Sequence, residues 1–140
     1  MTNEYRKLLP LPLNSELSKP FWEGTKRHEL LIQRCKRCSG YVWYPREVCT
    51  TCLSPDMEWT RMSGKGRLYT YTVIHQPANP VFRPDVPYIY AMIQLDEGPH
   101  IVSNLVECPI DQAHIDMPLE AVFDDVTPEW TLLKFKPASS

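Results

Sequence analysis

The sequence contains no apolar run long enough to cross a membrane or to act as a signal peptide. A membrane-spanning helix needs roughly 18 or more apolar residues in a row, and no stretch of this chain approaches that length. Residues 1–13 carry charges and prolines where a signal peptide would carry an unbroken apolar core. We therefore expect a cytoplasmic protein without a membrane partner.

The sequence also lacks the features of a histidine-dependent active site. Its four histidines have neither the spacing of metal ligands nor a nucleophile beside them. Cys108 precedes a proline, and no neighbouring base is present to activate its thiol. Internal repeats and low-complexity segments are also missing. We expect no catalysis by this chain alone.

Length and composition allow only one modest core. A chain of 140 residues with 43% hydrophobic content can bury that core and carry a metal-stabilised appendage, but it cannot build two full domains. The 14 prolines disfavour long helices. Although the net charge is only −2, residues 26–67 carry nine basic and four acidic side chains, and residues 68–140 carry three and ten. The first region therefore suits anionic partners better than the second.

Four cysteines form the one arrangement that dictates a specific chemistry. Cys35 and Cys38 make one Cys-x-x-Cys pair, Cys49 and Cys52 make another, and ten residues separate the pairs. Two residues between cysteines allow a tight turn to aim both sulfurs at one tetrahedral ion, so two such turns predict a four-thiolate shell. One structural zinc is the expected occupant. Iron in a rubredoxin-like shell also fits this spacing, whereas the regular pairing and the expected compartment disfavour two disulfides.

The apolar pattern predicts a mainly β protein in three parts. Residues 1–27 are expected to form an N-terminal arm and a short helix over Ser15–Lys26, with Ser18 as N-cap and with Gly24 weakening or ending the helix. Residues 28–62 are expected to form a rubredoxin-like zinc ribbon with strands over His28–Gln33 and Tyr41–Tyr44.

Residues 63–140 are expected to form a small antiparallel barrel. Five short β runs follow one another with turn residues between them and without a helical period, which best fits an OB-fold. Gly98 is expected to allow a tight hairpin between the second and third strands. The predicted strands are Arg67–His75, Tyr88–Leu95, His100–Val106, Leu119–Phe123 and Thr131–Lys136.

The order of helix, four-cysteine ribbon and five-stranded barrel resembles the acyl-CoA-associated zinc-ribbon/OB-fold family, small proteins found beside thiolases and thiolase-like enzymes. The resemblance runs from about Ser18 to Phe135, and Asp116 stands where the family pattern usually has glycine. It rests on the conjunction of Phe21-Trp22-Glu23-Gly24, Leu31-Ile32-Gln33-Arg34-Cys35, Tyr44-Pro45-Arg46, Gly64-Lys65-Gly66, Pro87-Tyr88, Leu95-Asp96-Glu97-Gly98 and Asp116-Met117-Pro118-Leu119.

The resemblance implies a non-catalytic subunit of a complex that makes or breaks C–C bonds in coenzyme A thioesters, with a thiolase-like catalytic partner. Coenzyme A carries phosphate groups, so Arg34, Arg46 and Lys65 are candidate substrate-binding residues near the ribbon. Phe21 and Trp22 on the helix are candidate partner-interface residues.

Two other functions compete with this one. Zinc ribbons and OB barrels both bind nucleic acids, but the acidic balance of the barrel region argues against an electropositive groove for single strands. A rubredoxin-like redox protein would need iron and would have no use for an attached barrel.

Overall fold

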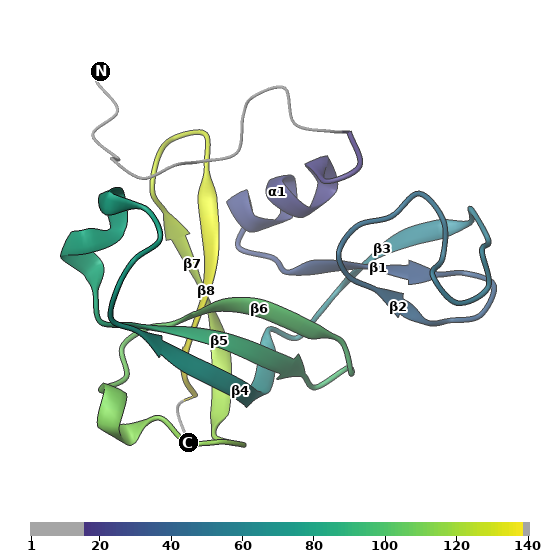
Figure 1. Ribbon diagram of the computed structural model, residues 1–140. Helices are drawn as coiled ribbons and strands as arrows, with labels where there is room; N and C mark the ends of the chain where they lie inside the picture. The colour runs from purple at the N-terminus through teal and green to yellow at the C-terminus, as the bar shows by residue number, and fades with distance from the viewer. Residues whose placement is uncertain (1–15, 139–140) are drawn as a thin grey trace.

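A computed structural model describes residues 16–138. They form a short helix, a three-stranded sheet and a closed five-stranded barrel, which confirms the predicted fold class. In Figure 1 the ribbon lies to the right of the barrel, and helix α1 lies above and between them. Within these residues, no helix is long and apolar enough to cross a bilayer.

Helix α1 spans Lys19–Lys26 and begins after Ser18, as predicted. Residues 16–18 form a turn, so the predicted start of the helix is too early, and Ser15 lies outside the described residues. Gly24 does not end the helix, contrary to expectation. Instead it allows a close approach to the ribbon, because a Cβ at this position would lie only 2.9 Å from Cγ of Leu31.

The ribbon sheet has the order β2-β1-β3, with both pairings antiparallel. Strand β1 spans Leu31–Cys35, later than predicted, because His28 takes a positive φ of 61° at the end of the helix. Strand β2 covers only Tyr41–Val42, so the predicted extension to Tyr44 is wrong. Strand β3, Met57–Arg61, was not predicted and pairs with the whole of β1.

The barrel has the closed order β4-β5-β6-β8-β7. All five predicted strands are present, and β5 has the predicted bounds. Gly98 has a φ of +119° and its N–H donates to the carbonyl of Leu95 at 2.8 Å, as the predicted hairpin requires. Two short 3₁₀ segments, η1 (Pro80–Asp85) and η2 (Ile110–Gln112), were not predicted. The strands are β4 Lys65–Ile74, β5 Tyr88–Leu95, β6 His100–Leu105, β7 Pro118–Asp125 and β8 Thr131–Pro137.

One hydrophobic core joins the barrel to the helix and to the base of the ribbon. Phe21 of α1 and Leu30 and Ile32 of the ribbon segment belong to the same buried cluster as the inward-facing barrel side chains. The distal ribbon has a far smaller cluster of its own, built on Cys35, Val42 and Cys49. Too few apolar side chains are buried there to hold the distal ribbon without further bonds.

Asp116, where the family pattern has glycine, has a positive φ of 70°. Its N–H donates to the carbonyl of Leu68 at 2.8 Å, and its own carbonyl accepts a hydrogen bond from the guanidinium of Arg67 at 3.0 Å. Aspartate is one of the residues that tolerate this conformation. Asp116 therefore takes the left-handed backbone conformation at a position where the family pattern usually has glycine.

Candidate metal centre and aromatic groove

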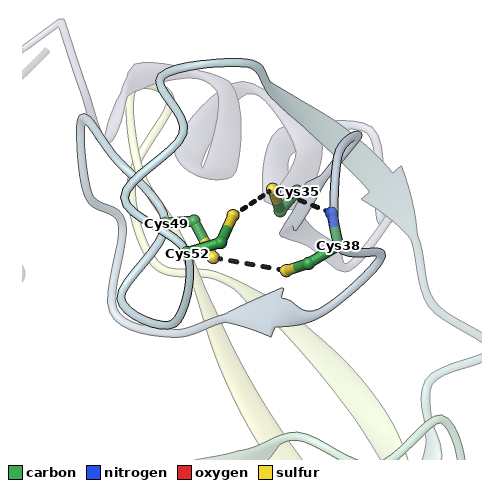
Figure 2. Close-up of side chains that lie close together, drawn as sticks. All are labelled: Cys35, Cys38, Cys49 and Cys52. Carbon is green, nitrogen blue, oxygen red and sulfur yellow. Dashed lines mark hydrogen bonds between the residues drawn. The ribbon is translucent and has the colours of Figure 1, made fainter.

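The four paired cysteines converge at the distal end of the ribbon, as the spacing predicted. Their sulfurs all lie within 4.8 Å of one another, and Figure 2 shows them pointing toward a common centre. Sγ of Cys35 is 3.5 Å from Sγ of Cys52, and Sγ of Cys38 is 3.6 Å from Sγ of Cys49. A tetrahedral shell with Zn–S bonds of about 2.3 Å separates its sulfurs by roughly 3.8 Å. The donor set and its geometry therefore fit one zinc ion.

Backbone N–H groups of the two turns favour thiolates at this site. The N–H of Cys38 lies 3.4 Å from Sγ of Cys35, and the N–H of Thr51 lies 3.3 Å from Sγ of Cys49. Hydrogen bonds from the N–H groups of Cys52 and Thr51 lower the pKa of Cys49 to about 6, and the N–H of Cys38 is the main cause of the lowered pKa of Cys35. Such N–H donors orient the sulfurs and stabilise their ionised form.

The Cys38 thiol shows why a cation is needed to complete the shell. The N–H of Gly40 lowers its pKa, but the neighbouring Cys49 sulfur and burial outweigh this effect and raise the pKa to about 11. Adjacent thiolates repel one another, so all four sulfurs ionise together only around a positive ion.

The cysteines are all free thiols, so the structure does not support the disulfide alternative. Cys108 lies apart from the cluster, and burial together with the charge of Asp111 raises its pKa. A raised pKa keeps a thiol protonated and poorly nucleophilic. That Cys108 has no catalytic role stays a prediction.

A buried glutamine, which the sequence analysis did not single out, holds the loop between the cysteine pairs. Gln33 on β1 is only 3% exposed. Its Oε1 accepts a hydrogen bond from the N–H of Arg46 at 2.7 Å, and its Nε2 donates to the carbonyl of Arg46 at 3.0 Å. The backbone of the connecting loop is therefore fixed against β1, which sets the position of the second cysteine turn.

The three candidate substrate-binding residues do not share one cavity. Arg34 is half-buried on β1, where its Nε donates to the carbonyl of Ser39 at 3.1 Å and its guanidinium lies over the ring of Tyr41. Arg46 is exposed and follows Pro45, which lines an apolar groove between the helix, the ribbon and the barrel. Lys65 is exposed and lines a separate, smaller cavity.

An apolar groove with a volume of about 460 Å³ lies where the helix, the ribbon and the barrel meet. In its aromatic wall, Phe21 packs edge to face against Trp22 with ring centroids 5.0 Å apart, and its ring is tilted against that of Trp43 with centroids 4.9 Å apart. Tyr44, Tyr90 and residues of β6 and β8 complete the lining. The groove lies over the seam between β6 and β8, where Leu105 pairs with Phe135 in parallel and Oγ of Ser103 donates to the carbonyl of Leu133 at 2.7 Å.

The structure corrects the expected exposure of the helix aromatics. Phe21 is only 7% exposed and belongs to the core, because α1 turns this side chain toward the barrel and the ribbon. It is therefore not an exposed docking side chain. Trp22 is half-buried, lines the groove and packs against Trp130 at a centroid distance of 5.1 Å.

Comparison with known proteins places the whole arrangement in a family. Residues 22–58 match the family model described as ChsH2, rubredoxin-like zinc ribbon domain, and residues 59–124 match ChsH2, C-terminal OB-fold domain. A DUF35 domain-containing scaffold protein of Methanocaldococcus jannaschii is 41% identical over 105 residues, which are 73% of each chain. The chain belongs to the DUF35 family. The family's zinc ribbon coincides with the four-cysteine cluster, which supports zinc as its metal.

Other DUF35 relatives carry names from acyl-CoA metabolism. A probable enoyl-CoA hydratase alpha subunit of Thermomonospora curvata is 35% identical over 133 residues, which are 95% of this chain and 41% of the relative. The chain thus spans about two fifths of that subunit. A solved structure titled Ltp2-ChsH2(DUF35) aldolase contains a chain that is 34% identical, with a TM-score of 0.82 over 92% of this chain and 100% of that one.

Proposed function

We propose that this DUF35 protein is a non-catalytic, zinc-binding accessory subunit of a cytoplasmic complex that makes or breaks C–C bonds in acyl-CoA thioesters. One observation carries the proposal: the chain matches the full length of a chain in a solved aldolase complex, at an identity that supports more than a shared fold. The name of the hydratase alpha subunit supports the same substrate class. The thiolates of the ribbon suit a reducing compartment.

In this proposal, a thiolase-like catalytic subunit supplies the reacting groups, and this chain completes the acyl-CoA site. The aromatic groove supports the second part, because its volume of about 460 Å³ is within the usual 300–1,000 Å³ of ligand pockets and its lining is mostly apolar. Trp22 packs edge to face against Phe21 and contacts the partner or the acyl group at the edge of this groove.

The basic side chains of the ribbon and barrel supply charge for the coenzyme A phosphates. Arg46 and Lys65 have exposed side chains, and Arg34 contributes its remaining guanidinium N–H groups. Because these residues do not line one cavity, each makes a separate contact within the complex. Loss of such a contact weakens substrate and transition state alike, so it raises KM more than it lowers kcat.

Purification of the tagged chain from its native host tests the proposal. We expect an acyl-CoA enzyme, identified by mass spectrometry, to co-purify in fixed stoichiometry. In that complex, Arg46→Ala and Lys65→Ala should raise the KM for the acyl-CoA several-fold with a smaller change in kcat. Glu129→Ala, an exposed charge with no role in the proposed site, serves as the control.

Titration of the isolated chain distinguishes this function from nucleic-acid binding. We expect weak binding of acyl-CoA, and no binding of a fluorescent single-stranded oligonucleotide at physiological salt. Tight oligonucleotide binding that falls steeply as salt rises would instead identify a nucleic-acid-binding protein.

A further inference from the structure

The outer surface of strands β4, β5 and β6 is almost free of charge. Because inward and outward side chains alternate along a strand, the register places Thr72, Tyr90 and Asn104 in one outward row and Thr70, Met92 and Val102 in the next. We call these six residues the uncharged face. In a chain of which 23% of residues are charged, two adjacent rows across three strands without an ionised group form a distinct surface.

The two remaining barrel strands show the contrast. On the outer surface of β7 and β8, Nζ of Lys136 lies 3.8 Å from Glu120, and Nζ of Lys134, which also lines the aromatic groove, lies 2.6 Å from Asp124. Such pairs between neighbouring strands are typical of a solvated sheet surface. Charge is therefore distributed unevenly around the barrel, and the uncharged face has the low charge of an interface core.

The uncharged face also exposes aromatic rings. Tyr90 is 49% exposed. Beside the face, Tyr69 is equally exposed and stacks on His100 with ring centroids 4.4 Å apart. Tyr90, Val102 and Asn104 also line the aromatic groove, so face and groove form one continuous surface. Exposed tyrosines are enriched where proteins meet.

We propose that the uncharged face is the surface on which the catalytic subunit docks, and that it pairs with an uncharged surface of that subunit. This inference rests on the proposed function and adds the location of the interface. A partner surface rich in charge would lose its hydration here without gaining an opposite charge, which is costly. An uncharged partner surface avoids this cost if it offers hydrogen bonds to the hydroxyl and amide groups of the face and apolar contact to Met92 and Val102. Such a surface would extend from the face to the rim of the groove.

The charge distribution favours a protein over a nucleic acid as the occupant. Exposed aromatics on an OB barrel also suit stacked bases, but single-stranded binding needs a cationic track along the phosphates. The basic side chains on the outer surface of the described β4–β6 strands are Lys65 and Arg67. Both lie at the start of β4, outside the two uncharged rows, and the guanidinium of Arg67 donates to the carbonyl of Asp116 at 3.0 Å. The face therefore provides stacking surface without the charge that nucleic acid requires.

Two matched valines provide the test. Val102 on β6 and Val122 on β7 are both half-buried and lie at outward positions of the barrel. Val102→Glu introduces a charge into the uncharged face, whereas Val122→Glu places the same charge opposite Lys134. We expect Val102→Glu to weaken the affinity for the purified catalytic subunit at least tenfold and Val122→Glu to change it less than twofold. Tyr90→Lys, at a more exposed position, should repeat the effect if Val102→Glu fails to fold.

A photo-crosslinking amino acid at position 90 identifies the occupant directly. A crosslink to the catalytic subunit, absent when the same group is at position 122, is the expected result. A crosslink to a second copy of this chain, or oligonucleotide binding that Val102→Glu abolishes, would overturn the proposal. So would wild-type affinity of both Val102→Glu and Tyr90→Lys. Failure of the wild-type chain to bind any acyl-CoA enzyme would refute the proposed function itself and is a separate outcome.

Discussion

At the level of single residues, replacing any of the four ribbon cysteines should cost the protein its zinc, whereas replacing Cys108 should not. Serine at position 35, 38, 49 or 52 removes one thiolate from the shell, and binding of a structural zinc supplies much of the folding free energy of so small a module. We expect each variant to lose most of its zinc and to expose the distal ribbon to proteolysis. Cys108→Ser should retain one zinc per chain by elemental analysis, and loss of zinc from that variant as well would contradict the assignment.

Gln33 should support the metal site although it touches no metal. Gln33→Leu keeps a similar volume but removes both hydrogen bonds to the backbone of Arg46, which should cost about 1–3 kcal/mol. We expect faster release of zinc to a chromophoric chelator. Gln94→Leu, at an exposed position on β5, is the matched control, and equal release rates for the two variants would show that the loop is held in another way.

Residue identity alone predicted the metal ligands but not the residues that position them. Two Cys-x-x-Cys pairs specify a chemistry by spacing, so Cys35, Cys38, Cys49 and Cys52 were found before the structure was known. Gln33 gives no such signal, because a glutamine becomes a structural clamp only when tertiary contacts bury it. Phe21 was expected to be exposed for a related reason: a helix of eight residues does not reveal from its sequence which aromatic side chain faces the core.

At the scale of strands and helices, the barrel was predictable because its strands are short β-rich runs separated by turn residues. The burial pattern of β5 alternates along its length, and its bounds were predicted without error. Strand β3 has a mixed pattern and is held by pairing with β1. Its formation depends on a partner that sequence analysis did not associate with it.

Gly66 should be the least replaceable glycine of the barrel. A Cβ at this position would clash with the carbonyl oxygen of Gln94, so alanine must push β4 away from β5. We expect Gly66→Ala to lower the free energy of unfolding by about 1–3 kcal/mol, measured by urea denaturation. Thr72→Ala, at an exposed position of the same strand, should cost less than half as much. An equal loss of unfolding free energy in the two variants would mean that β4 and β5 accommodate the new methyl group without strain.

At the scale of the whole molecule, the ribbon and the barrel should unfold as one unit. Phe21, Leu30 and Ile32 share a core with the barrel, so loss of zinc from the ribbon weakens contacts that the barrel also uses. We expect a chelator to lower the Tm of a single calorimetric transition. Two separate transitions, with the barrel transition unchanged by the chelator, would show that the shared core does not couple them.

The aromatic groove and the uncharged face also exist only at this scale. The groove combines residues near positions 21, 43, 90, 102 and 133, and the face combines three strands in register. Sequence analysis indicated the charge imbalance and the aromatic residues, but it could not show which of them meet. Long-range pairing of strands, rather than local pattern, creates both surfaces.

The proposed accessory role is tested most directly by measuring acyl-CoA turnover by the co-purifying enzyme alone, by this chain alone, and by the two recombined. We expect no turnover by this chain, low turnover by the enzyme alone, and full activity at a fixed molar ratio of the two. Turnover by the isolated chain, or an enzyme equally active without it, would refute the accessory role.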